Sequence, residues 1–202
     1  MNKMEHMEIK KLVISMSLPI IISMVIQALY NIVDSIFVAK ISSDALTAVS
    51  LCYPVQTIIV AIACGTAVGF NTLLARYLGE KKFDYANNTM MHGILLGFLN
   101  GLVFLVLGLL FSNIFLSWFT RDAQILGLAN TYIRICTMFS FSVFVQIIFE
   151  RIMQATGNAI YNMVMQGAGA IINIILDPIL IFGWFGLPKM GVTGAAIATV
   201  IG

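Results

Sequence analysis

Apolar residues dominate this chain in long runs, and charged residues are confined to the short stretches between them. Four runs contain no charged residue, namely residues 12–33, 45–75, 85–120 and 152–176. An α-helix rises about 1.5 Å per residue, so about 20 residues cross a hydrocarbon core that is about 30 Å thick. Each run can therefore span a bilayer as a helix, which satisfies its own backbone hydrogen bonds in lipid. The pattern predicts an all-α, polytopic membrane helix bundle.

The charged stretches divide the chain into five complete spans and a shorter sixth segment. The sixth segment begins near Gly191 and the sequence stops at Gly202. Because so short a helix reaches only about 18 Å, it does not cross the hydrocarbon core. We therefore expect the chain to be an N-terminal fragment of a longer protein. The expected spans cover residues 12–39, 45–77, 88–115, 125–148, 159–185 and 191–202, the last of them incomplete.

The composition agrees with a membrane protein and argues against other classes. Of 202 residues, 60% are hydrophobic and only 10% are charged, whereas about 25% are charged in soluble domains. The formal net charge of +2 is too small for a nucleic-acid-binding surface. Cys52, Cys64 and Cys136 form no CxxC pair, and His6 and His92 have no Cys or Glu at ligand spacing. We therefore expect no enzyme active site, no metal cluster and no cofactor.

Lysine and arginine are distributed unevenly between the two sides of the predicted bundle. The side that holds the N-terminus carries more of them than the opposite side, and cytoplasmic loops carry this excess, so we expect a cytoplasmic N-terminus. Trp118 and Trp184 then both lie at the outer interface, where tryptophan is enriched. The first side holds Lys3, Lys10, Lys11, Arg76, Lys81, Lys82 and Arg151, and the second holds Lys40, Arg121, Arg134 and Lys189.

Three ionisable residues interrupt the predicted spans, namely Asp34, Arg134 and Asp177. A charge inside the membrane costs about 2.5–3.5 kcal/mol on insertion scales, so each residue is a candidate functional group. Arg134 lies close enough to the outer face for its side chain to reach water, which favours a structural role. Asp34 and Asp177 lie near the outer ends of the first and fifth spans, which run in the same direction. We therefore expect the two carboxylates at similar depths in the outer half of the bilayer.

Each aspartate belongs to a stripe of polar residues at helical spacing. Polar faces avoid lipid, so the two stripes either face each other or line a wet cavity. A purely structural seam of hydrogen bonds is the alternative, although two acids at one depth favour a functional site. The stripes consist of Ser23, Gln27, Asn31 and Asp34 on the first span and of Asn162, Gln166, Asn173 and Asp177 on the fifth.

Prolines and glycines mark further special positions. Pro19 in the first span and Pro178, directly after Asp177, each remove a backbone donor from a helix. Both prolines are candidate hinges, and a simple kink is the alternative for each. Small residues at four-residue spacing predict close helix contacts on the second and third spans. These residues are Gly65, Gly69, Gly93, Gly97 and Gly101.

Several segments together resemble one transporter family. The segments read LPIIISMVIQALYNIVDSIFV, GTAVGFNTLLARYLGEKKFDYAN, YIRI followed by QATGNA, INIILDPILIFGWFG and MGVTGAAIAT. In order and spacing they are similar to the N-terminal six-helix lobe of a multidrug and toxic compound extrusion (MATE) transporter of the DinF-like branch. The resemblance covers residues 9–202.

The resemblance implies a twelve-helix transporter in two six-helix lobes, of which this chain supplies the first, with a truncated sixth helix. It implies export of amphipathic, often cationic, drugs and toxins across the plasma membrane, coupled to inward Na⁺ or H⁺. The family's cation site falls on Asp34, Asn173, Asp177 and Thr199, with Thr193 as a nearby alternative to Thr199. Tyr132 matches the aromatic residue that precedes the arginine of the fourth span. The candidate cavity-lining residues are Gln27, Asn31, Gln166 and Tyr132.

Other membrane proteins offer alternatives. An intramembrane aspartyl protease needs a GxGD motif, but Ile175 and Leu176 precede Asp177. A lipid-linked oligosaccharide flippase of the related superfamily is the strongest alternative, although the acids of this lobe suit a pyrophosphate poorly. A half-size transporter that works as a homodimer conflicts with the short sixth segment. The sequence leaves open the substrates and the choice between Na⁺ and H⁺.

Overall fold

The computed structural model describes residues 8–202, and these residues form α-helices and one 3₁₀ turn, without a β-strand. Lys3 and His6, which the sequence analysis included, lie outside the described residues. The all-α prediction is confirmed for the described part of the chain. The elements are α2 (Ile9–Ala39), α3 (Ser43–Gly79), α4 (Phe83–Ser117), α5 (Ala123–Met138), α6 (Ser140–Ala155), α7 (Ala159–Phe182), η1 (Trp184–Gly186) and α8 (Val192–Ile201).

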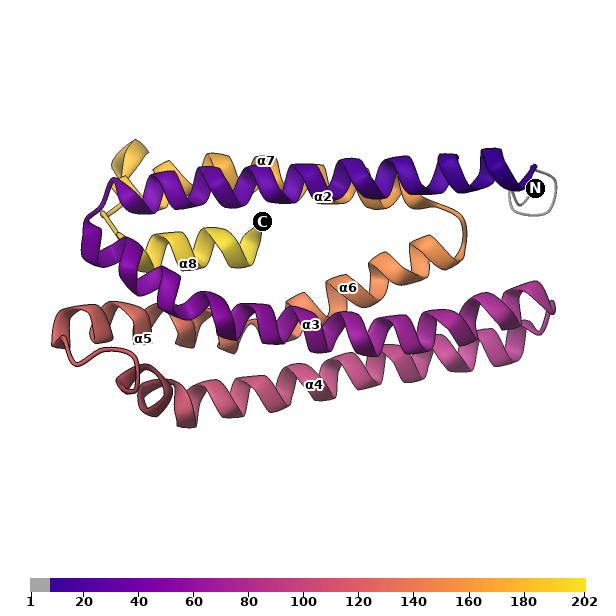
Figure 1. Cartoon of the computed structure of the whole chain (residues 1–202), viewed down its shortest axis with the longest axis horizontal. Helices are drawn as coiled ribbons and strands as arrows, with labels where there is room; N and C mark the ends of the chain where they lie inside the picture. The colour runs from indigo at the N-terminus through magenta and orange to yellow at the C-terminus, as the bar shows by residue number, and fades with distance from the viewer. Residues whose placement is uncertain (1–7) are drawn as a thin grey trace.

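The helices run back and forth along the long axis of the molecule (Figure 1). The N-terminal end of α2, the α3–α4 turn and the α6–α7 turn lie at one end of the molecule, and the α2–α3 turn, the α4–α5 turn and η1 lie at the other. Lys81 and Lys82 therefore belong to the end opposite Lys40 and Lys189. This alternating path is that of a polytopic bundle.

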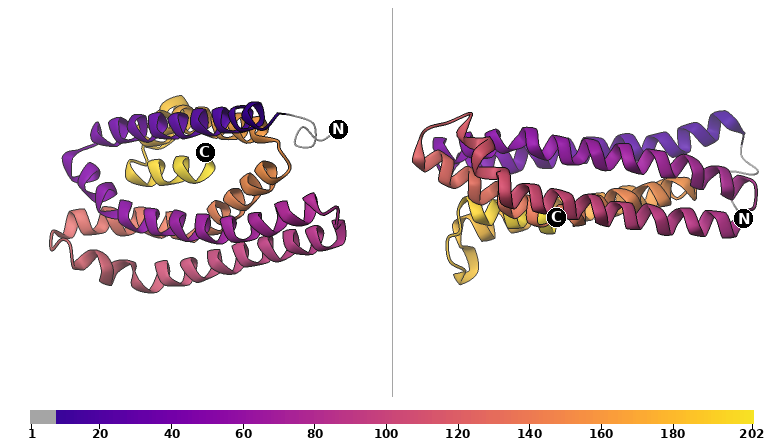
Figure 2. Two further views of the ribbon diagram at one scale, coloured as in Figure 1. Left: turned by 45° about the vertical axis from the view of Figure 1, so that its right-hand side comes forward. Right: turned by 90° about the horizontal axis from the view of Figure 1, so that it is seen from below.

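The helices form two groups. In the first group, α2 packs chiefly against α7 along the length of both helices (Figures 1 and 2). We call this the α2–α7 pair. In the second, α3 and α4 pack against each other and against α5 and α6, and we call it the α3–α6 group. Because α8 contacts both α7 and α5, it joins the two groups.

Four helices, α2, α3, α4 and α7, are long and apolar enough to cross a membrane. The helices α5 and α6 pass the same test only together, as one broken span. The remaining apolar helix, α8, has 10 residues. By length and composition, the described residues therefore contain up to five membrane spans and one shorter apolar helix.

The fourth expected span, residues 125–148, differs from the structure because a bend of 47° divides it into α5 and α6. The bend lies at Phe139, whose backbone has φ −101° and ψ 13°, outside the helical range. The Ser142 hydroxyl donates to the Phe139 carbonyl at 2.6 Å, so a side chain competes there for a backbone acceptor. The sequence predicted one continuous span here and gave no signal for the bend. The second helix, α6, also continues past the expected end of the span, to Ala155.

The fifth expected span also ends earlier in the structure. The helix α7 stops at Phe182 because Gly183 adopts a left-handed conformation, with φ 74°. Backbone N–H groups of the following loop then bond the last carbonyls of α7, from Met190 to Leu180 at 3.1 Å and from Gly191 to Ile181 at 3.2 Å. These bonds satisfy helix-end acceptors and fix the start of α8 against α7.

The two glycine patterns have different environments. A Cβ atom at Gly101 would lie 2.5 Å from the Phe141 Cα atom, and one at Gly93 would lie 3.1 Å from the Phe70 ring. The α4 glycines therefore allow close packing against α6 and α3, as predicted. In contrast, a Cβ atom at Gly65 or Gly69 would meet nothing within 4 Å. The prediction of a close helix contact at Gly65 and Gly69 is wrong for the described residues, since helical spacing does not reveal which face has a partner.

Candidate functional site

The α2–α7 pair brings the two intramembrane aspartates together. Asp34 is 9% exposed and Asp177 is fully buried, and their carboxylates interact electrostatically. Asn173 is also buried and lies one helical turn before Asp177 on α7. Two carboxylates and one amide, from two helices adjacent in space but distant in sequence, thus share one buried region.

These three side chains hold most of the buried polar atoms that lack a hydrogen-bond partner. Among the described residues, such atoms include Oδ1 of Asp34, both carboxylate oxygens of Asp177, and Oδ1 and Nδ2 of Asn173. A buried polar group without a partner costs about 1–3 kcal/mol, and a charged group costs more. Apart from Asn71 Oδ1 and Arg151 Nε, these atoms of the described residues belong to the three side chains, so most of the cost is concentrated where several acceptor oxygens lie. Such a cluster suits a proton or a cation.

The helix α8 approaches α7 closely enough to add a further side chain. A Cβ atom at Gly194 would lie 2.6 Å from the Leu180 carbonyl, so only glycine allows this approach without a shift. Five residues later, the Thr199 hydroxyl donates to the Ala195 carbonyl at 2.9 Å and also interacts with the Tyr132 side chain. Thr193, the alternative candidate, instead lines a separate hollow of about 420 Å³ beside Lys40 and Lys189. The structure therefore places Thr199, and not Thr193, beside Tyr132.

Tyr132 links the α3–α6 group to the aspartates. It is 1% exposed on α5 and interacts electrostatically with Asp34. The Gln56 side chain of α3 donates to the Tyr132 hydroxyl at 3.4 Å and to the Cys136 sulfur at 3.6 Å. Side chains from α2, α3, α5, α7 and α8 therefore contribute to one connected polar region. We call the set Asp34, Gln56, Tyr132, Asn173, Asp177 and Thr199 the acid pocket.

Sequence reasoning missed Gln56 and Tyr30. Tyr30 precedes Asp34 by one helical turn and interacts electrostatically with both Asp34 and Asp177. Its position on the helix could have indicated this, because residues four apart share a face. Gln56 offered no such signal, since the run 45–75 around it in α3 contains no charged residue. Only the packing of α3 against α5 brings it to Tyr132.

The other predicted residues have mixed environments. On α2, Ser23 is buried and donates to the Pro19 carbonyl at 3.0 Å, whereas Gln27 and Asn31 are exposed on this chain. On α7, Asn162 is buried and Gln166 is half-buried. The candidate hinges Pro19 and Pro178 both lie inside unbroken helices, α2 and α7. The remaining intramembrane charge, Arg134, is exposed and donates its Nε to Ser112 of α4 at 3.4 Å.

The donor set of the acid pocket limits its chemistry. Carboxylate, amide and hydroxyl oxygens bind hard cations such as Na⁺, and a carboxylate can instead take a proton. Within the described residues, no group of three or more His, Cys, Asp or Glu side chains could hold a metal ion. The pocket also lacks a nucleophile beside a general base, which hydrolysis requires. Its geometry therefore suits reversible binding of a small cation.

Comparison with known proteins gives the family context. Residues 19–179 match the family model MatE. Among curated relatives, a FAD transporter of Shewanella oneidensis is 29% identical over 95% of this chain and 42% of its own length. A probable multidrug resistance protein NorM of Thermotoga maritima is 26% identical, over 98% of this chain and 43% of its own. The multidrug export protein MepA of Staphylococcus aureus is 29% identical, with the same coverage as NorM. These relatives are transporters, not enzymes.

Solved structures agree with this assignment. A MOP superfamily transporter from Pyrococcus furiosus has a TM-score of 0.88 at 30% identity, over 95% of this chain and 42% of that chain. Structures of MATE in the straight and bent conformations have TM-scores of 0.86 and 0.85 at 31% and 30% identity, with the same coverage.

The family model does not separate the branches of the family, so the DinF-like assignment stays a prediction. The chain spans less than half the length of the relatives it matches. Its helices superpose on one part of proteins that carry a further part of similar size. The matched family model covers most of the chain, from Pro19 in α2 to Ile179 in α7. This chain therefore belongs to the MATE family of multi-pass membrane transporters.

Proposed function

We propose that this chain is the cation-coupling half of an antiporter that exports amphipathic, often cationic, compounds in exchange for Na⁺ or H⁺. The observation that carries the proposal is the acid pocket, in which Asp34, Asn173 and Asp177 present buried oxygens without hydrogen-bond partners. The relatives named for multidrug resistance and export support the substrate class. The FAD transporter of Shewanella oneidensis supports a wider range of substrates.

The coupling step follows from electrostatics. Two buried carboxylates repel each other, and a bound cation or proton relieves that repulsion. Binding therefore favours the conformation in which the carboxylates are closest, because a ligand shifts an equilibrium only by its differential affinity. The two carboxylates belong to α2 and α7, so their neutralisation changes how these helices pack. Pro19, which lacks a backbone donor, is where α2 would bend.

Movement of the coupling ion supplies the energy for export. One charge that crosses 100 mV releases about 2.3 kcal/mol, which supports roughly a fifty-fold substrate gradient. Asn173 and Thr199 supply neutral oxygens and carry no charge of their own, so they tune affinity for the ion. We propose that an exported compound contacts Gln27 and Asn31, which are exposed on α2, the helix that carries Asp34.

The proposal is tested by efflux measurements on the full-length protein. Asp34→Asn and Asp177→Asn keep the shape of each side chain and remove its charge, so both variants should reach the membrane but lose efflux of ethidium driven by Na⁺ or pH gradients. Asp84→Asn, at an exposed site on α4, is the matched control and should retain efflux. Wild-type efflux by both pocket variants, under both gradients, would show that the carboxylates are structural.

A second part of the proposal concerns orientation. We infer that the chain lies in the plasma membrane with its N-terminus in the cytoplasm, because the α3–α4 turn is rich in lysine. In a background without Cys52, Cys64 and Cys136, Lys81→Cys should react only with cytoplasmic thiol reagents and Lys189→Cys only with external ones. Labelling of both positions from the same side would contradict the proposed topology.

A further inference from the structure

A groove of about 590 Å³ runs between α3 and α4, on the side of the molecule formed by the α3–α6 group. It extends along α3 from Gly65 to Tyr77 and along α4 from Leu96 to Tyr85. None of the acid-pocket residues lines it. We call it the α3–α4 groove.

The floor of the groove is open because of two glycines. A Cβ atom at Gly65 or Gly69 would meet nothing within 4 Å, so these residues leave space that no side chain of the described residues fills. Gly93 differs, because a Cβ atom there would lie 3.1 Å from the Phe70 ring, and both residues line the groove. The GxxxG motif of α3 thus forms a shallow channel, and a slender apolar chain would fit it.

The polarity of the groove changes along its length. At the deep end, Thr66 accepts a hydrogen bond from Asn100 at 3.2 Å, so its polar atom already has a partner. At the end near the α3–α4 turn, the rings of Tyr77 and Tyr85 pack together, with centroids 5.5 Å apart. Tyrosine is enriched at the level of lipid headgroups. Asn88, Thr89 and His92 line the groove between the two ends, and Gly65 and Leu96 line the deep end, so the groove becomes more apolar away from the turn.

The length of the groove matches one leaflet. The distance from Tyr77 to Gly65 along α3 is about 18 Å at 1.5 Å per residue. Half of the hydrocarbon core is about 15 Å. An acyl chain that begins at the tyrosines would therefore end close to Gly65, near the bilayer midplane.

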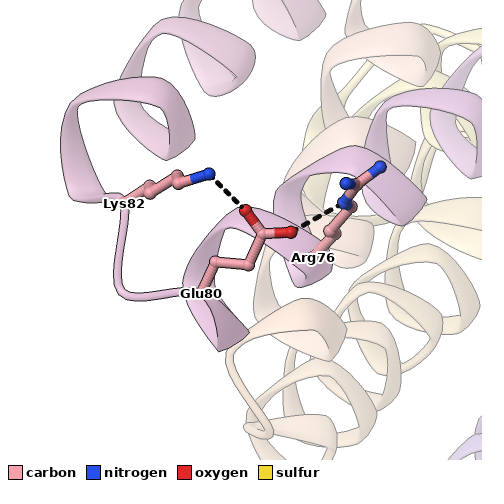
Figure 3. Close-up of polar contacts among 3 residues, drawn as sticks. All are labelled: Arg76, Glu80 and Lys82. Atoms are coloured by element: carbon pink, nitrogen blue, oxygen red, sulfur yellow. Dashed lines mark hydrogen bonds and ion pairs between the residues drawn. The ribbon is translucent and has the colours of Figure 1, made fainter.

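Two cationic residues near the interfacial end, Arg76 beside Tyr77 and Lys82 in the α3–α4 turn, share the carboxylate of Glu80 (Figure 3). Arg76 Nε and Lys82 Nζ both bond Glu80, at 2.8 Å each. These hydrogen bonds, first from Lys82 and then from Arg76, lower the pKa of Glu80 to about 2. One carboxylate thus serves two cations, and the bond from Arg76 uses only Nε, which leaves its Nη groups for another anion. An arginine guanidinium whose Nη groups are available is a preferred ligand for phosphate.

We propose that the α3–α4 groove binds an anionic phospholipid from the leaflet that faces the α3–α4 turn. One acyl chain lies over Gly65 and Gly69, and the phosphate contacts Arg76 and Lys82. Charge complementarity selects the occupant, because the turn is cationic and the headgroup is anionic. The proposal does not depend on the transport mechanism, since it needs only the membrane location of these helices.

The test is native mass spectrometry of the full-length protein, titrated in detergent with phosphatidylglycerol or phosphatidylcholine. Wild type should bind phosphatidylglycerol more tightly. Arg76→Gln should weaken that binding about five-fold, and Arg76→Gln with Lys82→Gln about thirty-fold, with little effect on phosphatidylcholine. Arg121→Gln, at the opposite end of the molecule, is the matched charge control and should bind like wild type. Equal affinity of wild type for the two lipids would overturn the proposal.

A second variant pair tests the channel itself. Gly69→Leu fills the channel and should remove the tight phosphatidylglycerol site, whereas Gly127→Leu, at an equally open position on α5, should not. If the two variants bind the lipid equally, the groove is not the site. Protein could also cover the groove, which Gly69→Cys distinguishes in a background without the native cysteines. Protection of this cysteine from thiol reagents in lipid-free detergent would mean that a helix occupies the groove, which would also overturn the proposal.

Discussion

Close helix packing has different consequences in the α2–α7 pair and in the α3–α6 group. In the α3–α6 group, glycines on α4 bring helices together and some polar groups have local partners, as Thr66 has Asn100. Of the described residues in this group, only Asn71, at Oδ1, and Arg151, at Nε, are among those with a buried side-chain polar atom that lacks a partner. In the α2–α7 pair, packing of similar closeness buries Asp34, Asn173 and Asp177 with oxygens that no donor reaches. Packing in the first region stabilises the fold. Packing in the second buries acceptors without partners, which costs stability, and we propose that these acceptors bind a ligand.

The largest expected effect is the loss of stability when a side chain is added at a packed glycine of the α3–α6 group. Gly101→Leu would place a side chain against the backbone of Phe141, so we expect a loss of about 3 kcal/mol or more and little folded protein. Gly65→Leu, in the open groove, should change stability by less than about 0.5 kcal/mol. The measurements are the yield of monodisperse full-length protein and its thermal unfolding midpoint. Similar yields for both variants would contradict the assignment of the packed and open faces.

The next effect concerns the α2–α7 pair. It is the change in the stability of the folded protein when Na⁺ or a proton binds. Neutralisation of Asp177 removes a buried charge without a partner, so Asp177→Asn should fold at least as well as wild type. Added Na⁺ or acidification should stabilise wild type, by about 2.7 kcal/mol at one hundred times the dissociation constant, and should stabilise Asp177→Asn less, because only the Asp34 carboxylate remains there to be neutralised. Thermal unfolding in a matrix of Na⁺ concentration and pH provides the test. Asp84→Asn should keep the full response, and a response of wild-type size in Asp177→Asn would contradict ligand binding at this carboxylate.

A smaller effect is expected where the two regions meet. Gln56→Ala removes a hydrogen bond to Tyr132, which in turn faces Asp34 and Thr199. Loss of one such bond is worth about 1 kcal/mol, so the half-saturating cation concentration should rise about five-fold. Gln124→Ala, on the exposed start of α5, is the matched control. If Gln56→Ala lowers the unfolding midpoint but leaves the cation dependence unchanged, Gln56 only supports the fold.

The smallest effect is expected outside both regions, at the α3–α4 turn. Because its pKa in the folded protein is lowered to about 2 from 4.5, Glu80 contributes stability that is fully present above pH 4.5 and is lost as the pH falls towards 2. The effect is small, since the ion pairs are exposed to solvent. The difference in unfolding midpoint between wild type and Glu80→Gln should therefore be constant above about pH 5 and should shrink below it. A difference that grows on acidification would contradict this assignment.

Several features of the site followed from sequence because the membrane makes them conspicuous. Asp34 and Asp177 are charges in long apolar runs, and Asn173 lies one turn from Asp177, so helical spacing alone placed them on common faces. Helical spacing predicted less well which side of α2 carries Gln27 and Asn31, which are exposed. Each residue turns a helix by about 100°, so Asn31 lies about 80° from Ser23 and falls on the exposed side of the stripe.

The sequence by itself determined the membrane-spanning character of the chain, the positions of most helices and the two acids, because charge is expensive in lipid wherever it occurs. Tertiary structure alone decided which helix faces meet. It brought Gln56 to Tyr132 and Tyr132 to Asp34, bent the chain at Phe139, and left Gly65 and Gly69 open while it covered Gly93 and Gly101. The physical reason is that helical periodicity fixes the angle between residues on one helix, whereas the partner of each face depends on the packing of all the others.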